Sequence, residues 1–159
     1  MNDRLKSSVA KFLSLLLMAV AWQLFFPAPA MAVCTIGSTS INFGSYDIFN
    51  SAPLDTTGSV VYQCGNRDRN ITISLDRGGA PSFNPRRMTQ GTWTLNYNLY
   101  LNAGRTVIWG DGSGGTQVFF ENNPRNNQNI TVPIYGHVPA GQGVSAGPYT
   151  NTITVIVNF

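Results

Sequence analysis

The last eleven residues of the chain alternate between apolar and polar side chains, which is the pattern of a half-buried β-strand. One face of this strand is apolar and is interrupted only by Asn151: Tyr149, Ile153, Val155, Val157 and Phe159. The other face carries mostly threonine and asparagine. An apolar strand left at the edge of a sheet is a template for pairing with another strand. Because no return strand follows Phe159, we expect the pairing strand to come from another chain.

Residues 1–32 have the features of a secretory signal peptide. Basic residues precede an apolar run, 12–26, of about 15 residues, which is shorter than the roughly 20 that a membrane-spanning helix needs. Ala30-Met31-Ala32 is a cleavage site of the small-residue kind. We therefore predict export without stable membrane insertion, and one mature domain of residues 33–159.

The mature part of the chain is almost neutral. It contains seven arginines, no lysine and six acidic residues, a net charge of +1, because the other basic residues lie in the predicted signal peptide. The basic pI of the whole chain is therefore mostly a property of the signal peptide. This balance gives no support to nucleic acid as a partner.

Both cysteines, Cys34 and Cys64, lie in the exported part. Export to an oxidising compartment favours a disulfide between them over a zinc site. The bridge would close a loop of about 30 residues and contribute roughly 3–4 kcal/mol of stability in the chain-entropy description.

Strand patterns recur along the mature chain, and no stretch keeps the spacing of an amphipathic helix. We predict strands at 34–36 with 41–43, 60–64, 71–75, 93–101, 107–109, 118–120, 130–138 and 149–159. Pro133 places its strand at a sheet edge or a bulge. Seven or eight short strands in about 125 residues indicate an all-β, antiparallel sandwich. A closed barrel is the alternative, although it needs a partner for every strand.

Candidate chemistry is sparse. His137 is the single histidine, and a strand-end histidine is most often a surface residue. The glycine-rich stretch 110–115 lacks the lysine and hydroxyl of a phosphate loop and the alternating acids of a calcium loop, so it is expected to be a hairpin connection. The six acids are scattered. We predict no enzyme activity, no metal and no cofactor. Phe49 and Phe83 do not follow a strand phase and are candidates for surface-binding loops.

The mature sequence resembles the spore coat U domain family, the single-domain subunits of archaic, Csu-type chaperone–usher pili. Eight segments carry the resemblance, in order: Cys34 with 43–46, 58–64, Arg87-Met88, 95–100, 109–112, 134–136, 138–142 and 147–149 leading into the terminal strand. Their order and spacing together make the match, since each segment alone is weak.

The resemblance implies an incomplete immunoglobulin-like sandwich that lacks its last strand. A periplasmic chaperone would lend a strand beside the terminal strand, and an outer-membrane usher would exchange it for the N-terminal extension of a neighbouring pilus subunit. It also implies a disulfide between Cys34 and Cys64, and a final location in a cell-surface fibre or coat reached through the periplasm.

One feature departs from a subunit that polymerises. Cleavage after Ala32 leaves only Val33 before Cys34, and earlier cleavage leaves Pro27 and Pro29 in any donor strand. We therefore expect a chain that accepts a strand without donating one, as in a distal subunit. A tip adhesin acting through its loops and, less favoured, a secreted hydrolase are the alternatives.

Overall fold

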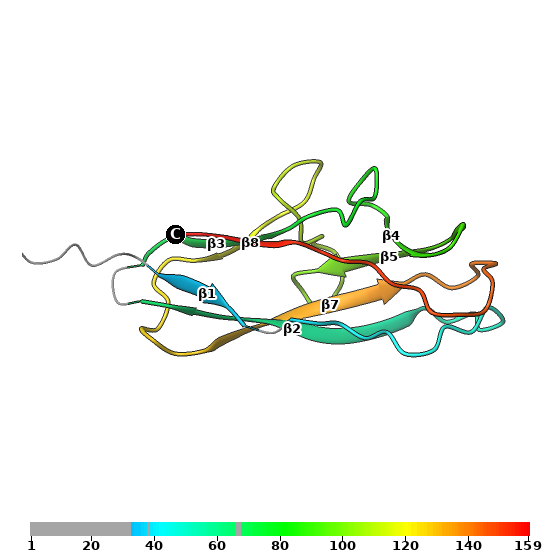
Figure 1. Ribbon diagram of the computed structural model, residues 1–159, viewed down its shortest axis with the longest axis horizontal. Helices are drawn as coiled ribbons and strands as arrows, with labels where there is room; N and C mark the ends of the chain where they lie inside the picture. Colours follow the sequence, from blue (N-terminus) through cyan, green and yellow to red (C-terminus); the bar gives the residue numbers. More distant parts are fainter. Residues whose placement is uncertain (1–32, 38, 66–67) are drawn as a thin grey trace, which may run out of the picture. The chain divides into compact units, whose positions relative to one another are not determined.

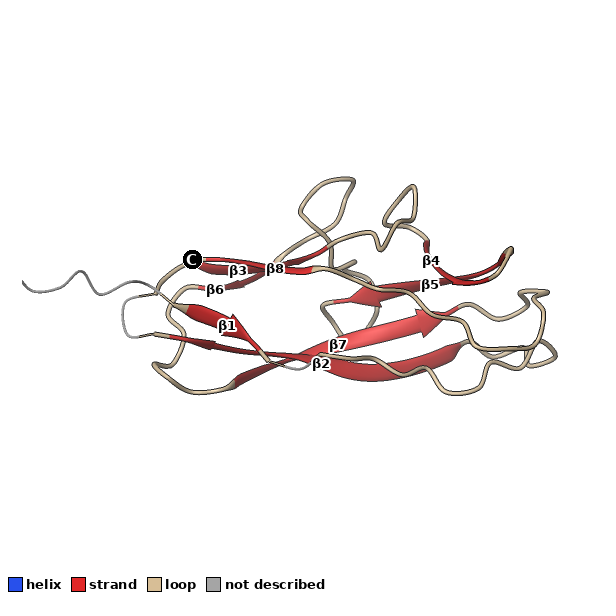
Figure 2. Ribbon diagram, in the orientation of Figure 1, coloured by secondary structure: helices blue, strands red, loops and turns tan. Residues whose placement is uncertain are grey.

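The computed structural model describes residues 33–37, 39–65 and 68–159, in which all regular structure is β-strand (Figures 1 and 2). The predicted signal peptide, residues 1–32, lies outside the described residues. Within the described part, no helix is long and apolar enough to cross a membrane. The strands are β1 (Cys34–Ile36), β2 (Leu54–Cys64), β3 (Ile71–Leu75), β4 (Arg86–Gln90), β5 (Trp93–Tyr100), β6 (Phe119–Glu121), β7 (Ile130–Val138) and β8 (Val155–Asn158).

The strands form two antiparallel sheets, so the fold is a sandwich and not a closed barrel. One sheet has five strands in the order β1-β2-β7-β5-β4, and the other has three in the order β6-β3-β8. Figure 1 shows β3 and β8 along one side of the domain and β1, β2 and β7 along the other. β1 and β8 are therefore both edge strands.

The core lies between the sheets and follows the predicted alternation. Val60, Tyr62, Ile71 and Ile73 are fully buried. Trp109, also fully buried, donates its indole N–H to the Ile73 carbonyl at 2.8 Å. Alternate residues of β2, β3, β5 and β7 thus fill one continuous core, as their sequence period predicts.

Several expectations about strands need correction. The segments 41–43 and 107–109 are not regular strands, although Ile108 and Trp109 make isolated bridges, and β2 begins at Leu54 and not at residue 60. β4 was not predicted, because its only buried apolar residue is Met88. The C-terminal strand is regular only over Val155–Asn158, and Thr150 before it makes an isolated bridge to Thr89. β7 is an interior strand and not the edge strand that Pro133 indicated. β5 pairs with β7 only from Tyr135 to His137, so among the named strands Pro133 pairs with β2 alone.

The two sheets differ in length. The eleven residues of β2 span about 37 Å and the five of β3 about 17 Å at 3.4 Å per residue. The short sheet therefore covers only part of the long one. Over the remainder, the segments after β1 and before β8 lie in place of strands.

Candidate functional site

A groove of about 940 Å³ opens where the three-stranded sheet does not extend. One wall is the segment 40–48 after β1, and the other is 144–151 with Ile153, before β8. Side chains of the long sheet form the floor: Leu54, Met88, Leu95, Tyr97, Leu99 and Val138. The groove thus lies between the two segments that continue the edge strands.

The floor is almost entirely apolar. Leu95, Leu99 and Val138 are at most 3% exposed and belong to the main hydrophobic cluster. They come from β5 and β7, whose alternation points them to the inner face of the sheet. The groove therefore gives direct access to the core.

The first wall is held by close packing against β7. Ile41 and Phe43 pack against the core, and a Cβ atom at Gly136 would lie 2.6 Å from the Phe43 ring and 2.7 Å from Ile41 Cδ1. Only glycine leaves room for this contact. The Phe43 ring also meets the Tyr97 ring edge-on, with 5.6 Å between centroids.

The second wall is fixed on one side by main-chain hydrogen bonds. Thr150 and Thr89 exchange both bonds, at 2.9 and 3.2 Å, and the Asp76 N–H donates to the Thr154 carbonyl at 3.1 Å. Bonded and non-bonded pairs alternate in an antiparallel ladder, so Val155 and Val157 occupy non-bonded positions opposite β3. Their N–H and C=O groups point away from β3, toward the free edge of the sheet.

The side chains of this wall follow the predicted faces, with one exception. Tyr149, Ile153, Val155 and Val157 pack against the core cluster, whereas Phe159 is 53% exposed. Asn151 interrupts the apolar row as the sequence indicated. Its amide Nδ2 donates to the Tyr97 hydroxyl at 2.9 Å.

The Asp76 side chain links the second wall to the turn after β3 by hydrogen bonds. Its Oδ1 accepts hydrogen bonds from the N–H groups of Thr154 at 3.0 Å and Gly78 at 2.9 Å. Burial alone would raise the pKa of Asp76, but these hydrogen bonds and the Arg86 charge outweigh it and lower the pKa below its ordinary value.

Beside the groove, the Gln142 side chain makes main-chain hydrogen bonds of the kind that a neighbouring strand would make. Gln142 accepts a hydrogen bond from the Asn96 N–H at 2.8 Å and donates to the Asn96 carbonyl at 2.9 Å. Its own N–H donates to the Tyr46 hydroxyl at 2.8 Å, and Tyr46 donates to the Pro139 carbonyl. The Gln142 carboxamide therefore extends the ladder beside β5 beyond the end of β7.

Sequence reasoning missed the buried guanidinium of Arg86, which is 0% exposed. It donates to the carbonyls of Asp76 at 3.0 Å and Trp109 at 2.6 Å, and to Asn98 Oδ1 at 2.9 Å. The expected exposure of Phe83 is wrong: its ring is only 7% exposed and lies 5.1 Å from the Arg86 guanidinium carbon. A cation–π contact explains this burial.

Phe49, in contrast, is 90% exposed, as predicted for a binding loop. The turn that carries it is ordered by hydrogen bonds from the Phe49 N–H to Asp47 Oδ1 at 2.9 Å and from the Asn50 N–H to the Asp47 carbonyl at 3.2 Å. Ile48 beside it is 41% exposed.

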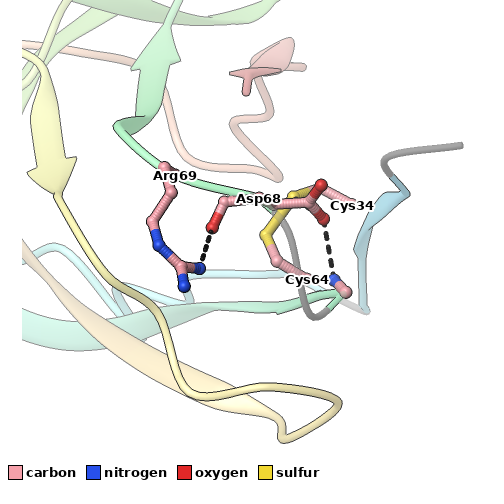
Figure 3. Close-up of a disulfide and its surroundings, with 5 residues drawn as sticks. Cys34, Cys64, Asp68 and Arg69 are labelled. Carbon is pink, nitrogen blue, oxygen red and sulfur yellow. Dashed lines mark hydrogen bonds between the residues drawn. A yellow bond between two sulfur atoms is a disulfide. The ribbon is translucent and has the colours of Figure 1, made fainter. Parts of the chain in front are cut away.

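Cys34 and Cys64 form a disulfide between register partners of β1 and β2. Figure 3 shows Asp68 beside it. Asp68 Oδ2 accepts a hydrogen bond from the Gly65 N–H at 2.7 Å. The cysteines and Asp68 cluster within 4.8 Å, but the sulfurs are already bonded to each other, so this is not a set of metal ligands.

His137 lies on the other face of the long sheet, where its Nδ1 is 2.6 Å from Asp55 Oδ1. Arg105 Nε is 3.3 Å from the same oxygen, and Tyr100 meets the His137 ring edge-on. Within the described residues, no hydroxyl or thiol is hydrogen-bonded to His137. The arrangement is a cross-strand polar cluster without a nucleophile.

Comparison with known proteins gives consistent results. The Spore Coat Protein U domain family matches residues 21–156. Protein U of Myxococcus xanthus is 34% identical over 143 residues, which cover 79% of this chain and 77% of that protein.

Among solved structures, the chain resembles one from the complex of the chaperone CsuC and the tip adhesion subunit CsuE of Acinetobacter baumannii Csu pili, with a TM-score of 0.56 and 22% identity over 81% of this chain. The match spans only 40% of that solved chain. A chain from a chaperone–usher pilus structure is 15% identical, with a TM-score of 0.48 over 85% of this chain and 92% of that one. The first likeness shows that the sandwich is shared.

Proposed function

Since the chain belongs to the Spore Coat Protein U domain family, we propose that it is a secreted structural subunit of a cell-surface pilus or coat that accepts a strand from another chain in its groove. The observation that carries this proposal is the open groove, whose apolar floor is part of the core and whose walls continue the edge strands β1 and β8.

An extended segment in this groove would satisfy two requirements at once. Its main chain would pair with the outward N–H and C=O groups of Val155 and Val157, and alternate side chains would cover the floor at Leu95 and Leu99. The missing strand of the sandwich would then be supplied from outside. Tyr149, Ile153, Val155 and Val157 remain the proposed acceptor residues, with Phe159 at the exposed end.

The proposed partners follow from this mode of binding. A periplasmic chaperone would occupy the groove first, an outer-membrane usher would mediate the exchange, and a neighbouring pilus subunit would supply the final strand. A chaperone complex is what the solved structure of the A. baumannii tip adhesion subunit contains, and sharing its fold makes the same mode feasible here. The final location would be the cell surface.

Two isoleucines provide a matched test. Ile153 lines the groove, whereas Ile156 lies on the opposite face of β8 and is 47% exposed. We expect Ile153→Asp to weaken the binding of an alternating apolar peptide by at least about tenfold, since it introduces a charge into the apolar site, and Ile156→Asp to leave binding unchanged. Ile153→Ala should act in the same direction as Ile153→Asp. Equal affinity of all variants would contradict the proposal.

We propose further that the chain is distal in the fibre, because cleavage after Ala32 leaves only Val33 ahead of Cys34, and earlier cleavage leaves Pro27 and Pro29 in the segment that would have to pair. The purified protein should remain monomeric at concentrations at which a donor peptide binds it. Head-to-tail polymers of this chain alone would refute the distal position without affecting strand acceptance.

A second function, adhesion through a loop, is favoured by Phe49. The Phe49 ring is 90% exposed on an ordered turn, so it makes few contacts in the free molecule. Its burial against a surface would remove apolar area from water, which is favourable. Phe49→Ser should reduce adhesion of cells that display the protein while leaving donor-peptide affinity unchanged. Unchanged adhesion would exclude this loop. We propose no catalytic role, and His137 within its cluster has no assigned chemistry.

A further inference from the structure

The floor of the groove is apolar except for the Tyr97 hydroxyl, which is hydrogen-bonded to one of the walls. Asn151 Nδ2 donates to the hydroxyl of Tyr97 at 2.9 Å, and both residues line the groove. Tyr97 belongs to the floor and also touches Phe43 of the opposite wall, with 5.6 Å between ring centroids. The pair therefore lies across the groove, between its two walls.

The position of the Asn151 side chain is set by its surroundings. A Cβ atom at Gly78 would lie 2.4 Å from Asn151 Nδ2 and 2.6 Å from Oδ1, so the carboxamide packs where only a glycine leaves space. Gly78 is itself held by Asp76 Oδ1, which accepts its N–H at 2.9 Å. Asn151 is thus supported from behind and presents its amide toward Tyr97.

The pair has unused hydrogen-bonding capacity. A tyrosine hydroxyl both donates and accepts, and a carboxamide oxygen accepts up to two bonds. Among the hydrogen bonds of the described residues, none uses the Tyr97 hydroxyl as a donor or Asn151 Oδ1 as an acceptor. Burial raises the pKa of Tyr97, so the hydroxyl keeps its proton near neutral pH. One donor and one acceptor are therefore available to an occupant of the groove.

We propose that this pair sets the register of the incoming strand by selecting a hydroxyl or carboxamide side chain (Ser, Thr, Asn or Gln) at the one inward position that faces it. This inference rests on the proposed strand-accepting function. The inward positions two residues before and after would be apolar, because Leu95 and Leu99 flank Tyr97 on the same face of β5. A strand shifted by two residues would put an apolar side chain on the polar pair and a polar one on leucine.

The test is a threonine scan of a donor peptide. The parent peptide, about ten residues long, has valine at every inward position and polar residues at the outward ones. Each variant replaces one inward valine with threonine, which has nearly the same shape. We expect all but one variant to bind the exported, purified protein about tenfold or more weakly, because a buried hydroxyl without a partner is costly. At the remaining position, threonine should bind as tightly as valine or up to about tenfold more tightly.

Two protein variants assign that position to the pair. In Asn151→Val and in Tyr97→Phe, the favoured threonine should lose its advantage and bind about as weakly as threonine elsewhere, while the all-valine peptide still binds. The scan on the unaltered protein decides the question even where a variant does not fold. Equal weakening by threonine at every position would overturn the inference but leave strand acceptance intact. Failure of the parent and all variants to bind would overturn both.

Discussion

At the scale of single residues, Arg86 is a charged group that the domain buries completely. A guanidinium removed from water must be satisfied by hydrogen bonds, and here the main-chain carbonyls of Asp76 and Trp109 and the amide of Asn98 accept them. The planar fork of arginine reaches several acceptors at once, which a lysine ammonium cannot do in the same geometry. Arg86 therefore ties β4, β5 and the loop before β4 into one unit.

We predict that Arg86→Lys lowers the free energy of unfolding by about 2–4 kcal/mol, since carbonyl groups and a buried charge lose their partners. Urea denaturation followed by tryptophan fluorescence measures the change. Arg87→Lys is the matched control, because Arg87 is the exposed neighbour on the same strand. A similar loss in both variants would mean that the buried fork has no special role.

Two buried tyrosines differ in whether their hydroxyl has a partner. The Tyr62 hydroxyl is buried with no hydrogen-bond partner among the described residues, whereas the Tyr97 hydroxyl accepts from Asn151. We predict that Tyr62→Phe leaves stability unchanged or raises it by about 1 kcal/mol, and that Tyr97→Phe lowers it by about 1 kcal/mol. Thermal and urea unfolding of the two variants measure this difference. The opposite order would show that the Tyr62 hydroxyl is satisfied in solution.

At the scale of elements, the C-terminal segment depends on a carboxylate. The lowered pKa of Asp76 means that its ionised form is stabilised in the folded state, so this contribution is fully present above the unfolded pKa, near 4, and is lost as the pH falls through the folded pKa. We predict that stability falls as the pH drops below about 4, and that Asp76→Asn reduces this dependence.

The measurement is urea unfolding as a function of pH, for the unaltered protein and for Asp76→Asn. Asp111→Asn is a useful comparison, because the pKa of Asp111 is also lowered, by hydrogen bonds from Ser113, but in an exposed turn away from β8. The protection factor of the Thr154 amide against hydrogen exchange should fall at low pH in the unaltered protein only. If the free energy of unfolding depends on pH in the same way in the unaltered protein and in Asp76→Asn, Asp76 does not cause the loss of stability in acid.

Alternation allowed most elements to be predicted, because it reports directly on which side chains enter the core. β3, β5 and β7 bury alternate apolar residues and were predicted, whereas β2 was predicted only over 60–64, where its buried residues alternate. β4 was missed because its innermost residue is Arg86, which reads as solvent-exposed in any hydropathy pattern. The burial of Phe83 was missed for the same reason, because its ring packs against the Arg86 guanidinium.

The candidate site was only half predictable. The sequence marked Tyr149, Ile153, Val155 and Val157 as one apolar face, and the structure packs them against the core. The opposite wall, residues 40–48, and the hydrogen bonds of Gln142 to Asn96 depend on contacts between residues far apart in the chain, which a local sequence period does not reveal. The regular strand also begins only at Val155, because within the described residues the backbone–backbone hydrogen bonds of the preceding segment, 149–154, are made by Thr150 and Thr154 alone.

At the scale of the whole molecule, the unequal sheets leave the core accessible through the groove. Leu95, Leu99 and Val138 line the groove, and no regular strand pairing joins its two walls. An occupant that supplies both main-chain pairing and apolar cover would bind the folded state and not the unfolded one. Such binding stabilises the fold by mass action.

We therefore predict that the free energy of unfolding rises with the concentration of a donor peptide, by about 2.7 kcal/mol at one hundred times its dissociation constant. The increase follows because the peptide completes a sandwich that the unfolded chain does not present. Urea unfolding at several peptide concentrations measures it, and a scrambled peptide of the same composition is the control. Ile153→Asp should flatten the dependence and Ile156→Asp should preserve it, since only the first side chain lies in the groove. A stability independent of peptide in the unaltered protein would mean that the groove is closed in solution.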